Sequence, residues 1–326
     1  MATYKQIFGT NIEVLASDPA NPVTGQVWYN STDNVVKGAA ATTAGAWATG
    51  GDLNKARRIL TGAGQSTQNA ALVFGGLPLG GDTEAYNGSS WTELNNMSTS
   101  VYGRGGAGNQ TSALAFGGGP APANNSNTET WNGTSWTEVN NMGTARYSIA
   151  GAGTQTSALG ASGYTPAPVR ILNESWNGTS WTEVNDLNTS SRSRAGVGID
   201  NTSALVFGGR LDPDAYAGIT ESWNGTSWTE VGDLNTARQN LVGGGVATLA
   251  LAFGGSTGSV SAATEEWNGT SWTTSPGSMN TARTSLAGVG TAASALGAGG
   301  YLPGLSAATE EWTGAGSPLI QTFTDS

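Results

Sequence analysis

Glutamates recur at fixed places along the chain and are its first candidates for chemistry. One set lies two residues before an aromatic residue, and a second set follows a tryptophan by two residues. The members are Glu84, Glu129, Glu174, Glu221, Glu265 and Glu310 in the first set, and Glu93, Glu138, Glu183 and Glu230 in the second. Two carboxylates in unlike environments could hydrolyse a glycosidic bond if they converged on it. Copies spread over every repeat do not converge, so we expect no catalytic residue and no enzyme. A hydrolase that uses Asp and Glu is the weakest alternative.

Composition excludes most other chemistries. The chain has 326 residues, no histidine and no cysteine, which removes Ser-His-Asp triads, thiolate nucleophiles, disulfides and imidazole metal ligands. We expect no cofactor and no metal site, although aspartates and backbone carbonyls could suffice for Ca²⁺. The net charge of −10 argues against nucleic acid as a partner. No apolar stretch approaches the ~20 residues of a spanning helix, so we expect no membrane insertion.

Two markers show that the chain is one small unit copied in tandem. The block W-N-G-T-S-W begins at Trp131, Trp176, Trp223 and Trp267, with a variant from Tyr86. The marker G-x-G recurs about every 45 residues, at Gly62, Gly106, Gly151, Gly196, Gly243 and Gly288. Each repeat predicts four short strands: a Gly/Ala-rich strand, a strand ending in a double glycine, a third with T-E-x-W, and a fourth from the second Trp. Asn-Gly between the last two predicts a type I′ turn with positive φ at both residues.

Four strands in about 45 residues match the blade of a β-propeller. A double glycine, an aromatic residue and a later tryptophan resemble the kelch repeat over residues about 57–312, with a shorter hairpin. We therefore predict an all-β fold, a six-bladed kelch-like β-propeller of four-stranded antiparallel blades. Glycine and alanine in the first strand fit the crowded axis, and tryptophans fill the wedges between blades. These structural tryptophans are Trp47, Trp131, Trp136, Trp176, Trp181, Trp223, Trp228, Trp267, Trp272 and Trp312.

The ends of the repeat array are imperfect, and they predict how the ring closes. The last repeat lacks a second tryptophan after Trp312, whereas residues 47–57 align with residues 228–238. We predict that residues 46–56 are a closing strand, with residues 46–50 completing the last blade; Leu319–Phe323 are the alternative. The domains are then a short N-terminal extension, residues 1–45, with a β-hairpin for attachment, and a propeller over residues 46–326.

One arginine per repeat accompanies the first set of glutamates. Arg57, Arg146, Arg238 and Arg283 precede the G-x-G marker by five residues, and the second and fourth repeats carry Arg104 and Arg192 or Arg194. One Arg and one Glu per repeat predict a repeated ion pair between blades, bidentate if partly buried.

The N-terminal extension carries the only clue to biological setting. Residues 24–37 resemble a G-x-x-W-Y-N-x-x-x-x-x-x-x-K hairpin of tail and fibre proteins of bacteriophages, especially marine ones. The resemblance implies a virion protein, in the tail or on the surface, assembled in the host cytoplasm and bound to other virion proteins through residues 1–45. A homo-oligomer fits this setting. The alternatives are an ordinary outer hairpin and an extracellular protein.

The loop after the double glycine differs in every repeat, while the rest nearly repeats. Variable loops on a rigid scaffold are where recognition usually resides. The side chains there that are most suited to contact a ligand are Tyr164, Arg170, Arg210, Asp212, Asp214, Tyr216 and Tyr301. We expect them to bind a host-surface glycan or protein. The alternative is a secreted or surface lectin, in which exposed tryptophans stack on sugars at equivalent sites between blades.

Overall fold

The computed structural model describes residues 12–323, except 20, 21, 24, 42, 43, 79, 120–122, 166–170, 212 and 317. Within these residues all regular structure is β-strand, as the sequence predicts. The chain divides into two compact units. Unit 1 comprises Met1–Gly45 and Gly314–Ser326, and unit 2 comprises Ala46–Thr313.

Unit 2 contains six four-stranded antiparallel sheets, named here first to sixth along the chain. The first three sheets are β5 (Thr61–Gly62), β6 (Leu72–Phe74), β7 (Thr83–Tyr86) and β8 (Trp91–Glu93); β9 (Gly105–Asn109), β10 (Ser112–Phe116), β11 (Thr128–Trp131) and β12 (Trp136–Val139); and β13 (Ala150–Gly153), β14 (Ala158–Ala161), β15 (Asn173–Trp176) and β16 (Trp181–Val184).

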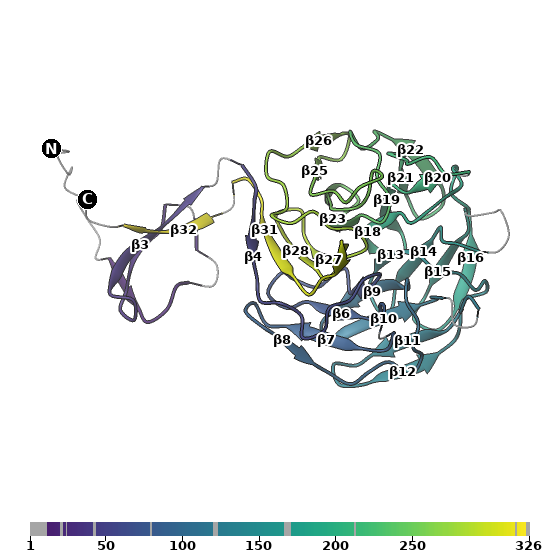
Figure 1. Cartoon of the computed structure of the whole chain (residues 1–326), viewed down its shortest axis with the longest axis horizontal. Helices are drawn as coiled ribbons and strands as arrows, with labels where there is room; N and C mark the ends of the chain where they lie inside the picture. Colours follow the sequence, from purple (N-terminus) through teal and green to yellow (C-terminus); the bar gives the residue numbers. More distant parts are fainter. Residues whose placement is uncertain are drawn as a thin grey trace. The chain divides into compact units, whose positions relative to one another are not determined.

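The other three sheets follow the same order of strands. They are β18 (Ala195–Asp200), β19 (Ser203–Phe207), β21 (Thr220–Trp223) and β22 (Trp228–Val231); β23 (Val242–Val246), β24 (Leu249–Phe253), β25 (Thr264–Trp267) and β26 (Trp272–Thr274); and β27 (Ala287–Gly290), β28 (Ser294–Ala298), β31 (Thr309–Thr313) and β4 (Ala46–Thr49). Two short pairs lie in loops, β17 (Ser191–Arg192) with β20 (Arg210–Leu211), and β29 (Tyr301–Leu302) with β30 (Gly304–Leu305). Figure 1 shows the six sheets around one axis, with β9, β13, β18, β23 and β27 near it.

The sixth sheet combines the two ends of unit 2. Its fourth strand is β4, which pairs antiparallel with β31 and places Trp47 opposite Trp312. The two rings lie 5.5 Å apart between centroids. The N-terminal strand thus occupies the place that the last repeat leaves empty.

The C-terminal strand takes a different partner. β32 (Pro318–Phe323) pairs with β3 (Val35–Ala41) in unit 1, in a sheet ordered β1 (Glu13–Leu15), β2 (Val27–Asn30), β3, β32. The prediction that residues 46–326 form one domain is therefore wrong at its C-terminal end. The alternative that Leu319–Phe323 complete the last sheet is wrong as well, because β4 takes the place beside β31 and these residues pair with β3 instead.

Glycines let the first strands approach one another at the axis. A Cβ atom on Gly151 would lie 2.5 Å from the carbonyl oxygen of Gly106 in the preceding sheet. A Cβ on Gly62 would lie 2.8 Å from the carbonyl oxygen of Gly288, in the sixth sheet. Real Cβ atoms do not come this close to backbone, so the crowding predicted for the first strand is confirmed.

The hairpin between the third and fourth strands differs from the predicted two-residue turn. Trp131 and Trp136 pair across a four-residue loop, and only Gly133 has positive φ, of 91°. Asn132 keeps ordinary φ, and its side-chain oxygen accepts hydrogen bonds from the amides of Thr134 and Ser135 at 2.9 and 2.8 Å. Asn132 therefore forms an Asx turn through its side chain and does not adopt the positive φ of a type I′ turn.

The core lies between neighbouring sheets. Leu72 and Phe74 of the first sheet cluster with Trp131 and Trp136 of the second. Phe74 and Trp136 rings are 4.9 Å apart, and the indole N–H of Trp136 donates to Thr83 Oγ1 at 2.9 Å. The same arrangement of second tryptophan and preceding sheet recurs around unit 2. Nine of the ten predicted structural tryptophans are buried, and Trp181 is half-buried.

Candidate functional site

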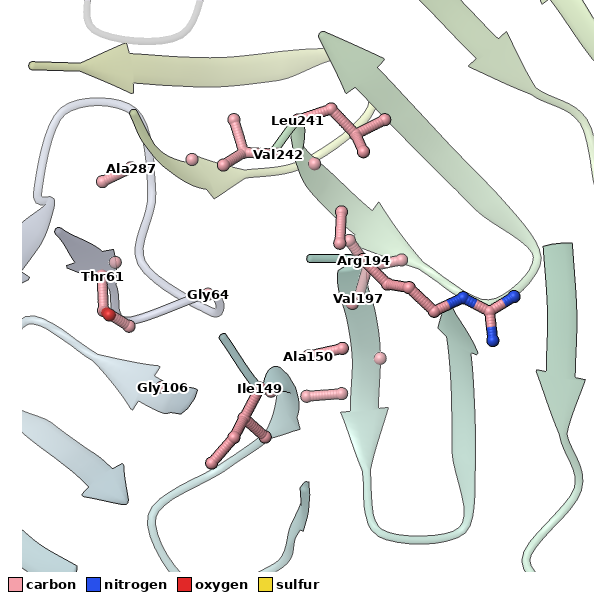
Figure 2. A pocket seen from close by; sticks show the side chains of 18 of the residues that line it. Thr61, Gly64, Gly106, Ile149, Ala150, Arg194, Val197, Leu241, Val242 and Ala287 are labelled. Atoms are coloured by element: carbon pink, nitrogen blue, oxygen red, sulfur yellow. The ribbon is translucent and has the colours of Figure 1, made fainter. Parts of the chain in front are cut away.

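The axis of unit 2 encloses a small cavity lined by the first strands. Its volume is about 130 Å³, and Figure 2 shows Thr61, Ala150, Val197 and Ala287 around it. No Asp or Glu of the described residues lines it. Small-molecule sites in proteins usually measure about 300–1,000 Å³. Gln65 reaches across from the first sheet and donates to the carbonyl of Gly198 in the fourth. The cavity is therefore smaller than a typical small-molecule site.

A second cavity of about 100 Å³, which shares Leu60 and Thr61 with the first, is bordered by backbone in an unusual conformation. In the segment that enters each sheet, one residue that lines this second cavity has φ between 51° and 64°: Ile59, Gly103, Ser148, Ser193, Asn240 and Ser285. The amides of five of them, all except Ser193, donate to the carbonyl of the preceding member, as in Ser148 to Gly103 at 2.6 Å and Ile59 to Ser285 at 2.7 Å. Positive φ is costly for a β-branched residue such as Ile59. The surrounding hydrogen bonds hold this strained rim in place.

The glutamates of the first set are all engaged in structural ion pairs. The pairs are Arg57–Glu84, Arg104–Glu129, Arg146–Glu174, Arg194–Glu221, Arg238–Glu265 and Arg283–Glu310, at 2.7–3.1 Å with each side chain no more than 5 % exposed. The predicted Arg–Glu pairing is confirmed, but not its geometry. One guanidinium nitrogen contacts one carboxylate oxygen, and both partners belong to the same repeat.

The fifth sheet shows why the pair is not bidentate. Glu265 Oε1 accepts from Arg238 at 2.9 Å, and Oε2 accepts from the backbone and side-chain amides of Asn235 at 2.7 and 3.1 Å. Arg238 also donates to two carbonyls. The ion pair thus joins the segment before the first strand of a sheet, which carries Asn235 and Arg238, to the third strand of the same sheet, which carries Glu265. Burial lowers the pKa of Arg238, opposed by the charge of Glu265. These carboxylates have no oxygen left for substrate chemistry.

Loops from the second to the third strand share one face with the segments that connect sheets. Isolated β-bridges join each connecting segment to such a loop, as in Tyr147 with Tyr164 and Thr284 with Tyr301. We call this side of unit 2 the variable-loop face. Arg170 and Asp212, two of the predicted contact residues, lie outside the described residues.

Aromatic residues gather on the variable-loop face between the second and fourth sheets. The Tyr102 and Tyr147 rings are 6.2 Å apart, and those of Tyr147 and Tyr164 are 5.1 Å apart. The guanidinium carbon of Arg192 lies 5.9 Å from the centre of the Tyr164 ring. Each ring is half-buried, so it is fixed by its neighbours while keeping an accessible edge or face.

Charged residues continue this row. Arg192 and Arg210 both contact Asp214 Oδ1, at 3.1 and 2.9 Å. Arg210 lies 5.7 Å from the centre of the Tyr216 ring. We call the whole row the tyrosine–arginine arc, consisting of Tyr102, Tyr147, Tyr164, Arg192, Arg210, Asp214 and Tyr216. Four predicted contact residues thus come together in it. Tyr301 lies apart, beneath Arg58 at 5.0 Å.

Sequence reasoning missed Tyr102, Tyr147, Arg192 and Arg58. They occupy one position of the repeat, just before the residue with positive φ, and belong to the connecting segments rather than to the loops. The six residues at this position are Arg58, Tyr102, Tyr147, Arg192, Gln239 and Thr284. The residue type at this position changes from repeat to repeat, although the residues around it nearly repeat. That variation was the signal that could have found them.

Unit 1 contains its own polar centre, built from the hairpin motif. Strands β2 and β3 pair antiparallel and bring Trp28, Asn30 and Lys37 to Asp18. Asp18 Oδ1 accepts from the Trp28 indole at 3.1 Å and from Asn30 at 2.8 Å, and Lys37 lies 2.8 Å from Oδ2. The hydrogen bond from Lys37, followed by that from Asn30, lowers the pKa of Asp18. Trp28, Asn30 and Lys37 of the hairpin motif therefore stabilise this hairpin through their shared contacts with Asp18.

No group of three or more Asp and Glu side chains in the described part of the chain is placed to hold a metal ion. None of the described residues forms a helix long and apolar enough to cross a lipid bilayer.

Solved structures share the arrangement of sheets. The structure of YjhT superposes with a TM-score of 0.68 over 83 % of this chain and 99 % of that one, at 13 % sequence identity. The fold is of the β-propeller type. Sequence identity this low shows the fold alone. No protein-family model matches the chain, and no curated protein does either.

Proposed function

We propose that the protein is a non-enzymatic recognition component of a virion, in a phage tail or fibre, which binds a host-surface glycan or protein through the variable-loop face. The observation that carries the proposal is the tyrosine–arginine arc. It is the place where residues that differ between repeats converge, whereas the glutamates of the first set are held in buried ion pairs. Tyrosine and arginine are also the residues that dominate binding surfaces.

The scaffold that we propose is a six-bladed propeller closed by β4, in the kelch-like manner. Bonds between the first and sixth sheets support it. Gln68 donates to the carbonyls of Ala295 and Trp312 at 3.0 and 2.9 Å, and Tyr86 donates to Glu311 at 2.6 Å. A closed ring holds loops from different repeats in fixed relative positions, which a recognition surface requires.

Unit 1 would serve as the attachment segment toward other virion proteins, either as a monomer or as a homo-oligomer. The hairpin centred on Asp18 supports this role, because it gives the N-terminal region a fold of its own. Exposed apolar side chains there are Ile12, Val14, Val23 and Phe323. They are suited to contact a neighbouring protein.

The lectin alternative, with equal sites between blades, receives less support. Its stacking platforms would be the repeated tryptophans, yet the indole groups of Trp131 and Trp136 are buried and donate to Gln110 and Thr83. A ligand count separates the two ideas: about six equal sugar sites per chain would favour the lectin, and one or none the virion protein.

The proposal is tested with purified phage particles and host cells. Mass spectrometry of the particles should detect the chain, and the purified protein should bind host cells and compete with adsorption. Tyr147→Ala should remove this binding, whereas Gln239→Ala, at the same position of another repeat, should preserve it. Absence of the chain from particles together with unchanged adsorption would refute the proposal.

A further inference from the structure

The fold places two arginines directly opposite each other on the variable-loop face. Arg192 of β17 and Arg210 of β20 are cross-strand partners in the antiparallel pair. Like charges opposite each other destabilise such a pair. An anion between them removes the conflict, and here the Asp214 carboxylate oxygen that contacts both guanidinium groups supplies it.

The Asp214 carboxylate lies where another anion could replace it, because it is exposed to solvent. The Asp214 side chain is 63 % exposed, compared with 22 % for Arg192 and 27 % for Arg210. Asp214 belongs to a tight loop in which the Leu211 amide donates to the Ala215 carbonyl at 2.8 Å. Ion pairs with an exposed partner contribute little stability, so another carboxylate can replace this one at small cost. The arginines are the more buried half of the pair, and the carboxylate is the exposed half.

Asp214 pairs with both arginines through one oxygen, Oδ1, at 3.1 and 2.9 Å. A guanidinium fork can hold both oxygens of a carboxylate. An incoming carboxylate could therefore present one oxygen to each arginine, whereas Asp214 shares a single oxygen between them.

Aromatic rings flank both arginines. Tyr164 lies beside Arg192, and Tyr216 lies beside Arg210. Tyr147 extends the aromatic surface away from the charged pair. Rings suit the apolar faces of sugars, and guanidinium groups suit a carboxylate attached to one of them.

We propose that the arc binds a carboxylate-bearing saccharide, with Arg192 and Arg210 on its carboxylate and Tyr164 and Tyr216 beside the sugar rings. Asp214 occupies the carboxylate position while the site is empty. This inference rests on the proposed recognition function and names the class of ligand. The carboxylate can come from a uronic acid or from a nonulosonic acid such as sialic acid.

The test measures binding of the full chain to matched saccharides by calorimetry. Oligogalacturonate is compared with its carboxyl-reduced form, and sialyllactose with lactose, which separates the two sources of the carboxylate. We expect one acidic saccharide to bind at least roughly tenfold more tightly than its neutral counterpart, because hydrogen bonds to charged groups are the stronger kind. Binding should weaken from about 50 mM to about 500 mM salt.

Variants assign the binding to the arginine pair. Arg192→Gln and Arg210→Gln should each weaken binding of the acidic saccharide at least roughly tenfold. Arg58→Gln is the matched control, because Arg58 has the same repeat position as Arg192 and also lies over a tyrosine; it should change affinity less than about twofold. Asp214→Asn should strengthen binding, since the competing carboxylate is gone. Unchanged unfolding midpoints show that the variants fold.

Three results would overturn the inference: equal binding of acidic and neutral saccharides or none of either, equal effects of Arg58→Gln and Arg192→Gln, or loss of binding in Asp214→Asn. Host-cell binding that survives Arg192→Gln but not Tyr147→Ala would refute the carboxylate site and leave the recognition function standing. Absence of any host-cell binding would refute both.

Discussion

The indole N–H of Trp47 donates to Thr264 Oγ1 at 2.9 Å, across 217 positions of the chain. The bond joins the N-terminal strand of the sixth sheet to the third strand of the fifth. Phe253, also in the fifth sheet, packs on Trp47 with ring centroids 4.8 Å apart. The first strand of unit 2 is therefore packed like the fourth strands that carry Trp136, Trp181 and Trp272.

Removal of β4 should destabilise unit 2 far more than removal of the residues before it. Deleting residues 1–45 leaves β4 in place, whereas deleting residues 1–56 exposes the edge of β31 and the face of Phe253. We expect the second deletion to lower the melting temperature sharply relative to the first, since burying one tryptophan alone contributes about 3–5 kcal/mol. Differential scanning calorimetry measures both. Equal melting temperatures would show that β4 adds no stability to the ring.

Trp228 identifies a weak point in one sheet interface. In the five other sheets the second tryptophan donates to a threonine of the preceding sheet, as Trp181 does to Thr128 at 2.9 Å. Asn173 replaces that threonine in the third sheet, and the buried Trp228 Nε1 has no partner among the described residues.

We therefore expect Asn173→Thr to stabilise the protein by about 1 kcal/mol, because it supplies the missing acceptor. The reverse change, Thr128→Asn, should cost about 1–2 kcal/mol by leaving the indole of Trp181 unpaired. Urea denaturation gives both values. The interpretation fails if the two substitutions shift the midpoint in the same direction.

Glu221 should matter for stability, whereas its cross-strand neighbour Glu230 should not. Glu221 is fully buried and bonded to Arg194 at 2.8 Å, while Glu230, directly opposite in β22, is exposed. Glu221→Gln leaves a buried guanidinium without its counter-charge, and breaking a buried pair in this way costs about 3–5 kcal/mol. Glu230→Gln is the control and should cost less than about 0.5 kcal/mol. Equal unfolding midpoints for the two variants would contradict the structural role.

Tyr86 should make stability fall at alkaline pH. Burial, followed by its hydrogen bond to Glu311, raises the pKa of Tyr86 from 10.0 to about 12. Below pH 10 both folded and unfolded chains keep the proton, and between pH 10 and 12 only the unfolded chain loses it. The contribution of Tyr86 is therefore complete below pH 10 and is lost as pH approaches 12, by up to about 3 kcal/mol.

The variant Tyr86→Phe isolates this effect from other groups that titrate in the same range. Its stability should be lower than that of the parent at pH 9, and the gap between the two should close toward pH 12. Guanidinium denaturation at a series of pH values measures the gap. A constant gap would mean that Tyr86 does not titrate with the expected pKa.

Much of the scaffold was predictable because the same turn residues, strand motifs and tryptophans occur in successive repeats. The double glycines, the T-E-x-W strands and the paired tryptophans gave strand order and sheet number without any long-range information. The ion pair of Arg238 and Glu265 was predictable too, since one basic and one acidic residue accompany every repeat. Its single-oxygen geometry was not, because it depends on the backbone amide of Asn235, which competes for the second oxygen.

The tyrosine–arginine arc was only half predictable. Tyr164, Arg210, Asp214 and Tyr216 lie in loops whose variation is visible in the sequence. Tyr102, Tyr147 and Arg192 lie in connecting segments that otherwise read as conserved scaffold between repeats. Nothing local distinguishes a connecting segment that borders a neighbouring loop from one that does not.

The sequence by itself determined that the protein is an all-β array of repeated units with a distinct N-terminal hairpin. Strand periodicity, turn residues and wedge-filling tryptophans act over a few residues, so they can be read along the chain. The imperfect ends of the array also pointed to residues 46–50 as the strand that completes the last sheet, with Leu319–Phe323 as the alternative. Only the tertiary structure decided that β32 joins β3 and that Arg192 faces Arg210 beside Asp214. These choices depend on which edges and side chains meet in space after hundreds of intervening residues have folded, and local pattern carries no information about that.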